Sequence, residues 1–198
     1  MSRRITKDKN MQKKIFTLRV TTPRAVMIIA FNDFKDQEYF VPREVFEKAG
    51  FQIITASFKN GIARGSEGGE AEVDILVKNA DAKEYEAVVF VGGPGAFKYL
   101  DDADAHKLAQ SALKQNKILG AICIAPVALA KAGVLKNKNA TVWSSSMDKS
   151  AVRELEKNGA NYKDQNVVQD NRIITANGPE AAREFGEAIV RVLLNSYD

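Results

Sequence analysis

The chain has 198 residues, of which 45% are hydrophobic and 27% charged, as is typical of a globular protein with one substantial core. No apolar run approaches the roughly 20 residues that a membrane-spanning helix needs, so we expect no membrane partner. Cys123 is the only cysteine, so no disulfide can form within the chain, which favours a reducing cytoplasm.

The net charge of +4 comes from one end of the chain. Residues 1–24 carry eight Lys or Arg and one acid, whereas the rest carries 21 basic and 24 acidic side chains. The chain therefore divides into a basic tail, residues 1–23, and a single domain, residues 24–198. Any binding of nucleic acid would depend on the positive charge of this tail. The sequence favours the simpler interpretation that the tail is solvated.

Deleting residues 1–22 is expected to leave the thermal stability of the domain nearly unchanged, because this segment has no periodic apolar face. Melting curves of the full and truncated chains test this. A loss of several degrees in Tm would mean that the segment KIFTLRV (14–20) pairs as an edge strand or packs on a partner subunit.

The domain opens with a continuous apolar run, AVMIIAF (25–31), which is typical of a parallel strand buried on both faces. VPREVFEKAG (41–50) predicts a helix with Pro42 in its first turn and Gly50 at its end. After it we expect, in chain order, a strand at 51–57, a loop or hairpin at 59–72, an apolar segment at 73–77, a strand at 86–93, a helix at 102–116, a strand at 117–123 and a helix at 126–133.

Helix 102–116 is expected to bury one stripe, formed by Ala105, Leu108, Ala109, Ala112 and Leu113. The remaining sequence predicts a short strand at 140–143, a charged helix at 148–158, a hairpin at 166–178 that turns at Asp170–Asn171, and a closing helix at 179–195. Alternating strands and helices predict an α/β fold, a three-layer α/β/α sandwich with a mostly parallel sheet.

Three groups of polar or glycine residues follow predicted strands. They are the acids Asp33, Asp36 and Glu38 after the first strand, GGPGA (92–96), and Cys123. In a flavodoxin-like strand order 2-1-3-4-5 these strands are neighbours, so their carboxyl ends line one crevice, where α/β proteins bind ligands.

The stretch GAICIAP (120–126) is typical of a nucleophile elbow, in which a strand turns sharply into a helix. Ala121 and Ala125 supply the small side chains that the elbow needs two residues from Cys123. The helix amino end is expected to lower the pKa of Cys123, and the amides of Ile124 and Gly93 face a developing oxyanion. The alternative is that Cys123 is a small buried core residue.

Several segments resemble the ThiJ/PfpI superfamily over almost the whole domain. They are VVFVGGPGAFKYL (88–100), KILGAICIAPVALAKAGVLKNKNATVW (117–143), IITANGPEAAREFGEAIVRVLL (173–194) and EYFVPREVFEKAGF (38–51). The resemblance implies a class I glutamine amidotransferase-like fold, Cys123 as nucleophile, Glu38 as its hydrogen-bonding partner, and Gly93 and Ile124 as oxyanion amides. It also implies a homodimer or hexamer.

One departure from the family concerns histidine. Many protease-like members of the family have a histidine directly after the cysteine, where this chain has Ile124. Another branch has a histidine just after the strand at 140–143, where this chain has WSSSMD (143–148). The only histidine, His106, is expected on a solvated helix face away from the crevice. Local donors for the thiolate would then be Ser144, Ser145 or Ser146. Asp33 and Asp36 are expected to be loop acids, and no metal or cofactor motif stands out.

Two functions stay open. One is a cysteine-dependent hydrolase or deglycase that acts on small carbonyl adducts or glycated amines. The other is a non-catalytic oxidative-stress sensor or chaperone in which Cys123 is oxidised. An intracellular peptidase is disfavoured because the dyad histidine is absent, and a glutamine amidotransferase because its downstream His-x-Glu is missing.

Overall fold

Seven strands form the central sheet of the protein, in the spatial order β11-β12-β8-β7-β1-β3-β6. They are β1 (Arg24–Ile28), β3 (Gln52–Ser57), β6 (Ile75–Leu76), β7 (Ala87–Phe90), β8 (Ile118–Ile122), β11 (Val167–Asp170) and β12 (Ile173–Ala176). All neighbours pair in parallel except β11, which is antiparallel to β12. The expected flavodoxin-like order is confirmed in β3, β1, β7, β8 and β12.

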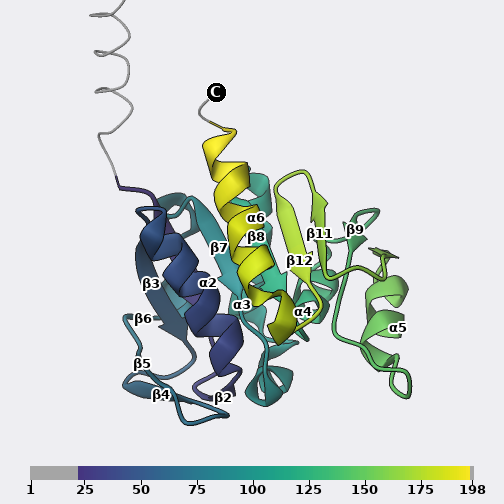
Figure 1. Cartoon of the computed structure of the whole chain (residues 1–198), viewed down its shortest axis with the longest axis horizontal. Coiled ribbons are helices and arrows are strands. Elements are labelled where there is room, and N and C mark those ends of the chain that lie inside the picture. The colour runs from purple at the N-terminus through teal and green to yellow at the C-terminus, as the bar shows by residue number, and fades with distance from the viewer. Residues whose placement is uncertain (1–21, 197–198) are drawn as a thin grey trace, which may run out of the picture.

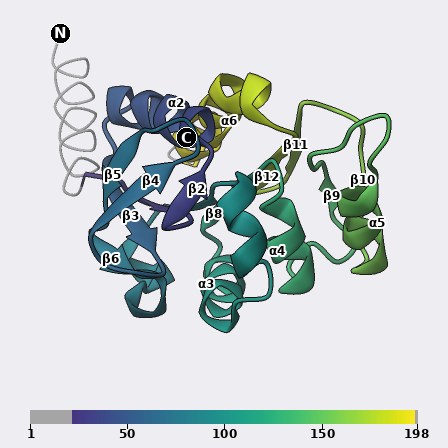
Figure 2. The same ribbon diagram turned by 90° about the horizontal axis from the view of Figure 1, so that it is seen from below.

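The computed structural model describes residues 22–196, so most of the basic tail, with its KIFTLRV segment, lies outside the described residues. Helices cover both faces of the sheet and complete three layers (Figures 1 and 2). One face carries α2 (Asp36–Lys48) and α6 (Ala182–Leu194), and the other carries α3 (Ala103–Lys114) and α4 (Pro126–Lys131).

Smaller elements lie at the two ends of the sheet. At one end are α5 (Ser150–Lys157), β9 (Asn139–Ala140) and β10 (Asn161–Tyr162), and at the other β2 (Asn32–Phe34), β4 (Ile62–Gly65) and β5 (Glu70–Glu72). Short 3-10 helices are η1 (Val77–Asn79), η2 (Ala82–Glu84), η3 (Pro94–Tyr99) and η4 (Pro179–Ala181).

The apolar run of β1 divides between two hydrophobic cores because its side chains alternate across the sheet. Val26 and Ile28 pack with residues of α3 and α4, whereas Ala25 and Met27 pack with residues of α2 and α6. Both faces of the strand are buried, which explains why its sequence is apolar at every position.

Two local expectations were wrong. The helix expected at 41–50 begins at Asp36, so Pro42 lies in its interior and offers no N–H to the Glu38 carbonyl. An acid in the first turn favours this earlier start through the helix dipole. Leu113, placed on the buried stripe of α3, is 41% exposed and lies one residue before the end of the helix.

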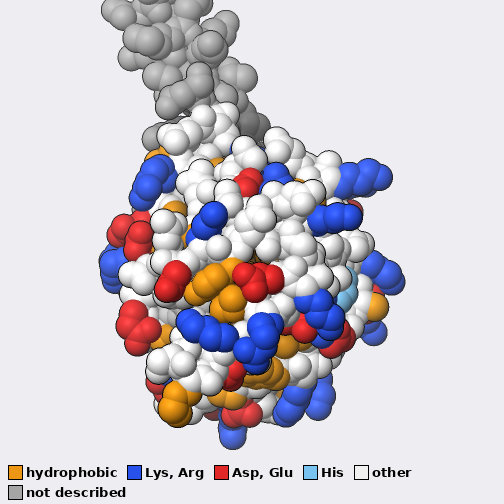
Figure 3. All heavy atoms as spheres, turned by 90° about the vertical axis from the view of Figure 1, so that its right-hand side faces the viewer, with side chains coloured by type: hydrophobic (Ala, Val, Ile, Leu, Met, Phe, Trp, Pro, Cys, Tyr) orange, Lys and Arg blue, Asp and Glu red, His pale blue; other side chains and the backbone are white. Residues whose placement is uncertain are grey.

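The surface on the α5 side intermixes acidic and basic side chains (Figure 3). This face therefore presents no continuous basic surface of the kind that binds nucleic acid. Across residues 22–196, every helix is too short or too polar to cross a membrane.

Candidate active site

The carboxyl ends of β1, β7 and β8 meet at the edge of the sheet that faces the viewer in Figure 2. Glu38 enters this edge from the start of α2, Gly93 from the end of β7, and Cys123 and Ile124 from the end of β8. All four residues line one cavity of about 410 Å³. The structure thus brings together the residues that the sequence placed at separate strand ends.

The walls of this cavity are largely apolar. Its polar side chains are Lys35, Glu38 and Cys123. Its other lining residues are Gly93, Pro94, Phe97, Ile124, Trp143 and Pro179. A mostly hydrophobic concavity with a few convergent polar groups is the usual form of a small-molecule site.

Cys123 sits on the sharp turn that its neighbours predicted. Its φ of +62° lies in the left-handed region, which is strained for a residue with a side chain. Hydrogen bonds on both sides hold this conformation: the Cys123 N–H donates to Ala176 O at 2.9 Å, and the Trp143 N–H donates to Cys123 O at 2.9 Å. Ala121 and Ala125 are buried beside it, so larger side chains would clash there.

Glu38 is fully buried beside the thiol. Its Oε2 accepts a hydrogen bond from the Gly92 N–H at 3.1 Å. Its Oε1 is buried without a hydrogen-bond partner of normal geometry within residues 22–196. Burial raises the pKa of Glu38 to about 7, although contacts with the Cys123 thiol and the Gly92 amide oppose that rise. A carboxyl group with this pKa can both accept and return a proton near neutrality.

The expected lowering of the Cys123 pKa was wrong. The pKa of the thiol is raised to about 12, chiefly by burial and then by the neighbouring Glu38 carboxylate. The backbone amides of Gly93 and Ile124 act in the opposite direction, because a nearby N–H dipole favours the negatively charged thiolate. The helix that follows, α4, has only six residues, and its field does not compensate for the loss of water.

The paired glycines after β7 are required by close backbone contacts. Gly93 has a φ of +105°, and a Cβ on it would lie 2.3 Å from the backbone nitrogen of Lys35. A Cβ on Gly92 would lie 2.7 Å from both Cys123 Cβ and Glu38 Oε2. The glycines therefore let the β7 loop approach both Cys123 and the start of α2.

The three serines considered as thiolate donors lie beyond the residues that line the cavity. Ser144 Oγ accepts a hydrogen bond from Lys149 Nζ at 3.0 Å, and Ser145 Oγ accepts one from the Asp148 N–H at 3.0 Å. Ser146 is exposed in the same loop. The groups that lower the pKa of the Cys123 thiol are instead the backbone amides of Gly93 and Ile124.

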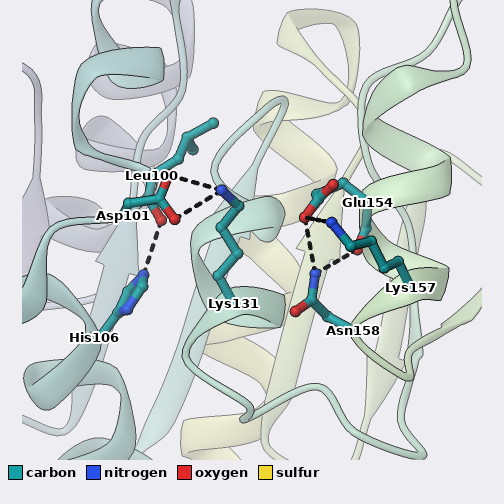
Figure 4. Close-up of polar contacts among 7 residues, drawn as sticks. All are labelled: Leu100, Asp101, His106, Lys131, Glu154, Lys157 and Asn158. Carbon is teal, nitrogen blue, oxygen red and sulfur yellow. Dashed lines mark hydrogen bonds and ion pairs between the residues drawn. The ribbon is translucent and has the colours of Figure 1, made fainter.

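His106 is half-buried on α3, and its Nε2 lies 2.8 Å from the Leu100 carbonyl oxygen (Figure 4). The His106 side chain was expected to be solvated, but the backbone of the turn before α3 provides it with a hydrogen-bond partner. Lys131 of α4 contacts Asp101 in the same turn at 2.7 Å. His106 is not among the residues that line the cavity, so its imidazole takes no part in the Cys123 site.

Asp36, expected to be a solvated loop acid, is buried. Its carboxylate accepts hydrogen bonds from the N–H groups of Glu67 at 2.8 Å and Gly69 at 2.6 Å. It therefore anchors the β4–β5 hairpin, while Asp33 is exposed as expected. Within residues 22–196, no three His, Cys, Asp or Glu side chains group as metal ligands would.

Sequence reasoning missed several residues of the cavity, namely Lys35, Pro94, Phe97, Trp143 and Pro179. Phe97 directly follows the GGPGA segment, and Lys35 precedes Glu38 by three residues. Both could therefore have been predicted from their closeness in sequence to expected site residues. Trp143 ends a short predicted strand, and only the fold places it next to Cys123.

Comparisons with known proteins identify relatives of this chain. The DJ-1/PfpI family model matches residues 24–192. The protein MJ0967 of Methanocaldococcus jannaschii is 37% identical over 86% of this chain and 82% of its own length. The glutathione-independent glyoxalase DJR-1.2 of Caenorhabditis elegans is 27% identical over 85% of this chain and 88% of its own.

A solved structure of a related protein has the same fold. The ThiJ/PfpI domain protein of Brachyspira murdochii superposes with a TM-score of 0.83 at 35% identity, over 88% of this chain and 98% of that one. The family match spans nearly all of the described domain and includes the elbow, the paired glycines and Glu38. The chain belongs to the DJ-1/PfpI family.

Proposed function

We propose that the protein is a cysteine-dependent enzyme that acts on small reactive carbonyl compounds and converts the 2-oxoaldehydes among them to 2-hydroxy acids. The observation that carries this proposal is the pairing of the Cys123 thiol with a buried Glu38 whose pKa is about 7, at the base of an open apolar cavity. A relative named as a glyoxalase supports the same chemistry. Glycated amines, which are carbonyl adducts, are a further substrate class for this site.

The first step is addition of sulfur to the aldehyde carbon. Glu38 takes the thiol proton as the sulfur–carbon bond forms, and the amides of Gly93 and Ile124 stabilise the alkoxide that develops. Cys123 and Glu38 share one proton in this state. The form with a thiol and a carboxylate and the form with a thiolate and a carboxylic acid are tautomers, and both lead to the same hemithioacetal. This step needs no leaving group.

The next steps redistribute hydrogen within the substrate. Glu38 first passes the thiol proton to the alkoxide, which completes the hemithioacetal and restores the carboxylate. The carboxylate then removes the proton from the former aldehyde carbon and returns it to the neighbouring carbonyl carbon, while the hydroxyl proton moves from the first oxygen to the second. The first carbon is thereby oxidised to a thioester and the second reduced to an alcohol. Water then hydrolyses the thioester, which releases a 2-hydroxy acid and regenerates the thiol. One water is consumed, and the oxidation and reduction balance within one substrate molecule.

The geometry favours this reaction over the alternatives. Hydrolysis of a peptide must protonate an amine leaving group, a task commonly performed by imidazole, and His106 does not reach the cavity. Oxidative sensing needs a thiolate that is present before any substrate binds, whereas the raised pKa of Cys123 favours a thiol that loses its proton to Glu38 only as sulfur adds to a carbonyl carbon.

The purified protein is expected to convert methylglyoxal to lactate, and Cys123→Ala to lose this activity. Because Glu38 acts as the base, kcat/KM should rise with pH through about 7 and then level off. Chromatographic measurement of lactate over a pH series tests both points. Peptide cleavage that depends on Cys123, or oxidation by mild peroxide without any carbonyl turnover, would contradict the proposal.

A further inference from the structure

Two large aromatic side chains line the cavity above Cys123 yet remain accessible to solvent. Phe97 is 60% exposed and Trp143 is 36% exposed. Each comes from a different segment: Phe97 from η3 after β7, and Trp143 from the chain after β9. Large apolar side chains that gather, exposed, around one concavity mark a place where a hydrophobic group binds.

The position of Trp143 relative to the nucleophile is fixed by the backbone. The backbone N–H of Trp143 donates to the carbonyl oxygen of Cys123 at 2.9 Å. This hydrogen bond fixes the backbone of Trp143 next to the turn that carries Cys123. Phe97 follows Gly93 in the same loop, and the Gly93 backbone lines the cavity beside Cys123 and lowers the pKa of its thiol. Both aromatic side chains are thus held by the segments that hold the reacting atoms.

The cavity is larger than the smallest substrates require. Its volume of about 410 Å³ falls in the range, roughly 300–1,000 Å³, of pockets that enclose drug-sized ligands. Methylglyoxal bound to Cys123 would leave most of this volume, and both aromatic side chains, in contact with water. A carbonyl compound with a larger apolar substituent would bury them.

The charges at the cavity disfavour an anionic substituent. Lys35 is the one cation among the lining residues, and its Nζ lies 2.5 Å from Glu67 Oε1. An incoming carboxylate or phosphate would have to compete with Glu67 and would also approach Glu38. The remaining walls, which include Ile124, Pro94 and Pro179, are apolar.

We infer that the cavity binds a neutral hydrophobic substituent of the carbonyl substrate, preferably an aromatic ring, and that Phe97 and Trp143 are the residues that select it. This inference deepens, and rests on, the proposed function. The preferred substrates are therefore aryl-substituted or similarly bulky 2-oxoaldehydes, with phenylglyoxal, which would yield mandelate, as the simplest probe.

Kinetics with two substrates test this specificity. Wild-type kcat/KM is expected to be about tenfold or more higher for phenylglyoxal than for methylglyoxal. Phe97→Ala and Trp143→Ala should reduce that ratio toward one, and Trp143→Phe should restore most of it. Leu194→Ala removes a side chain of matched exposure, 59%, at the far end of α6, and should leave the ratio unchanged. Equal wild-type efficiencies, or a ratio that neither alanine variant alters, would overturn the inference.

A binding measurement separates this inference from the reaction itself. Trp143 is the only tryptophan of the chain, so its fluorescence reports on the cavity directly. Benzyl alcohol, which does not react with thiols, should change the emission of Cys123→Ala in a saturable way, and 1-propanol should act only at much higher concentration. Saturable binding without any carbonyl turnover would support the aromatic site and count against the proposed enzyme. Turnover without selective binding would refute the aromatic site alone.

Oligomeric state gives the last control. If Phe97→Ala and Trp143→Ala shift the elution of the protein in size-exclusion chromatography, the two side chains pack between subunits, and the inference fails. Unchanged elution, together with the loss of aromatic selectivity, assigns both side chains to substrate.

Discussion

Replacing Glu38 by Gln is expected to give a protein that is more stable above pH 7 and much less active. Gln keeps the size of the side chain and can still accept the hydrogen bond from the Gly92 N–H. It can neither take the thiol proton nor carry a charge. Loss of a general acid–base residue typically lowers kcat by about 10²- to 10⁴-fold, and we expect a loss in that range.

The gain in stability follows from the raised pKa of Glu38. The native protein holds this proton up to about pH 7, whereas the unfolded chain releases it near pH 4.3. Between these values the native state binds more protons than the unfolded state, so wild-type stability falls as pH rises. Glu38→Gln removes this loss, which amounts to on the order of 3 kcal/mol at pH 8 and to almost nothing near pH 4.

Urea unfolding of both proteins at pH 5 and pH 8, beside assays of aldehyde turnover, measures the two effects. Glu47→Gln, on the exposed side of the same helix, is the matched control and should show neither effect. Removing the Glu38 charge should also bring the pKa of Cys123 below about 12, since that charge helps to raise it. Unchanged turnover in Glu38→Gln would refute the role of Glu38 as the base.

Gly93→Ala should destabilise the protein by at least about 3 kcal/mol and abolish carbonyl turnover. Its backbone, with φ of +105°, is one that only glycine adopts without strain. A Cβ there would lie 2.3 Å from Lys35 N and 2.7 Å from Asp33 O. Both are backbone atoms, so relief requires the β2–α2 loop to move, and the Gly93 amide would turn from the sulfur.

Gly50→Ala provides the comparison for this variant. Gly50 also has a positive φ, of +86°, but a Cβ on it would meet nothing within 4 Å. Its substitution therefore reports backbone strain alone and should cost about 1 kcal/mol, with turnover retained. Denaturation midpoints of the two variants separate strain from steric overlap. Equal costs for the two would show that the contact at Gly93 relaxes easily.

Local sequence was sufficient for the layers of the fold and for the elbow. The apolar runs of β1, β7 and β8 are continuous because both of their faces are covered, and that pattern is readable without a structure. The small side chains on either side of Cys123 likewise reflect a local steric demand of the turn. Helix boundaries were less readable, since the true start of α2 at Asp36 depends on contacts with the distant β4–β5 hairpin.

The electrostatics of the site were decided only by tertiary structure. The local sequence around Cys123 predicts a thiol with a lowered pKa at the start of a helix. The fold instead buries the thiol and places Glu38 beside it, so the pKa of Cys123 rises. The same holds for the cavity walls, because Phe97 and Trp143 become neighbours of the thiol through strand order and not through sequence spacing. Desolvation and charge–charge interaction depend on every group packed around an atom, and no linear pattern of residues specifies that surrounding.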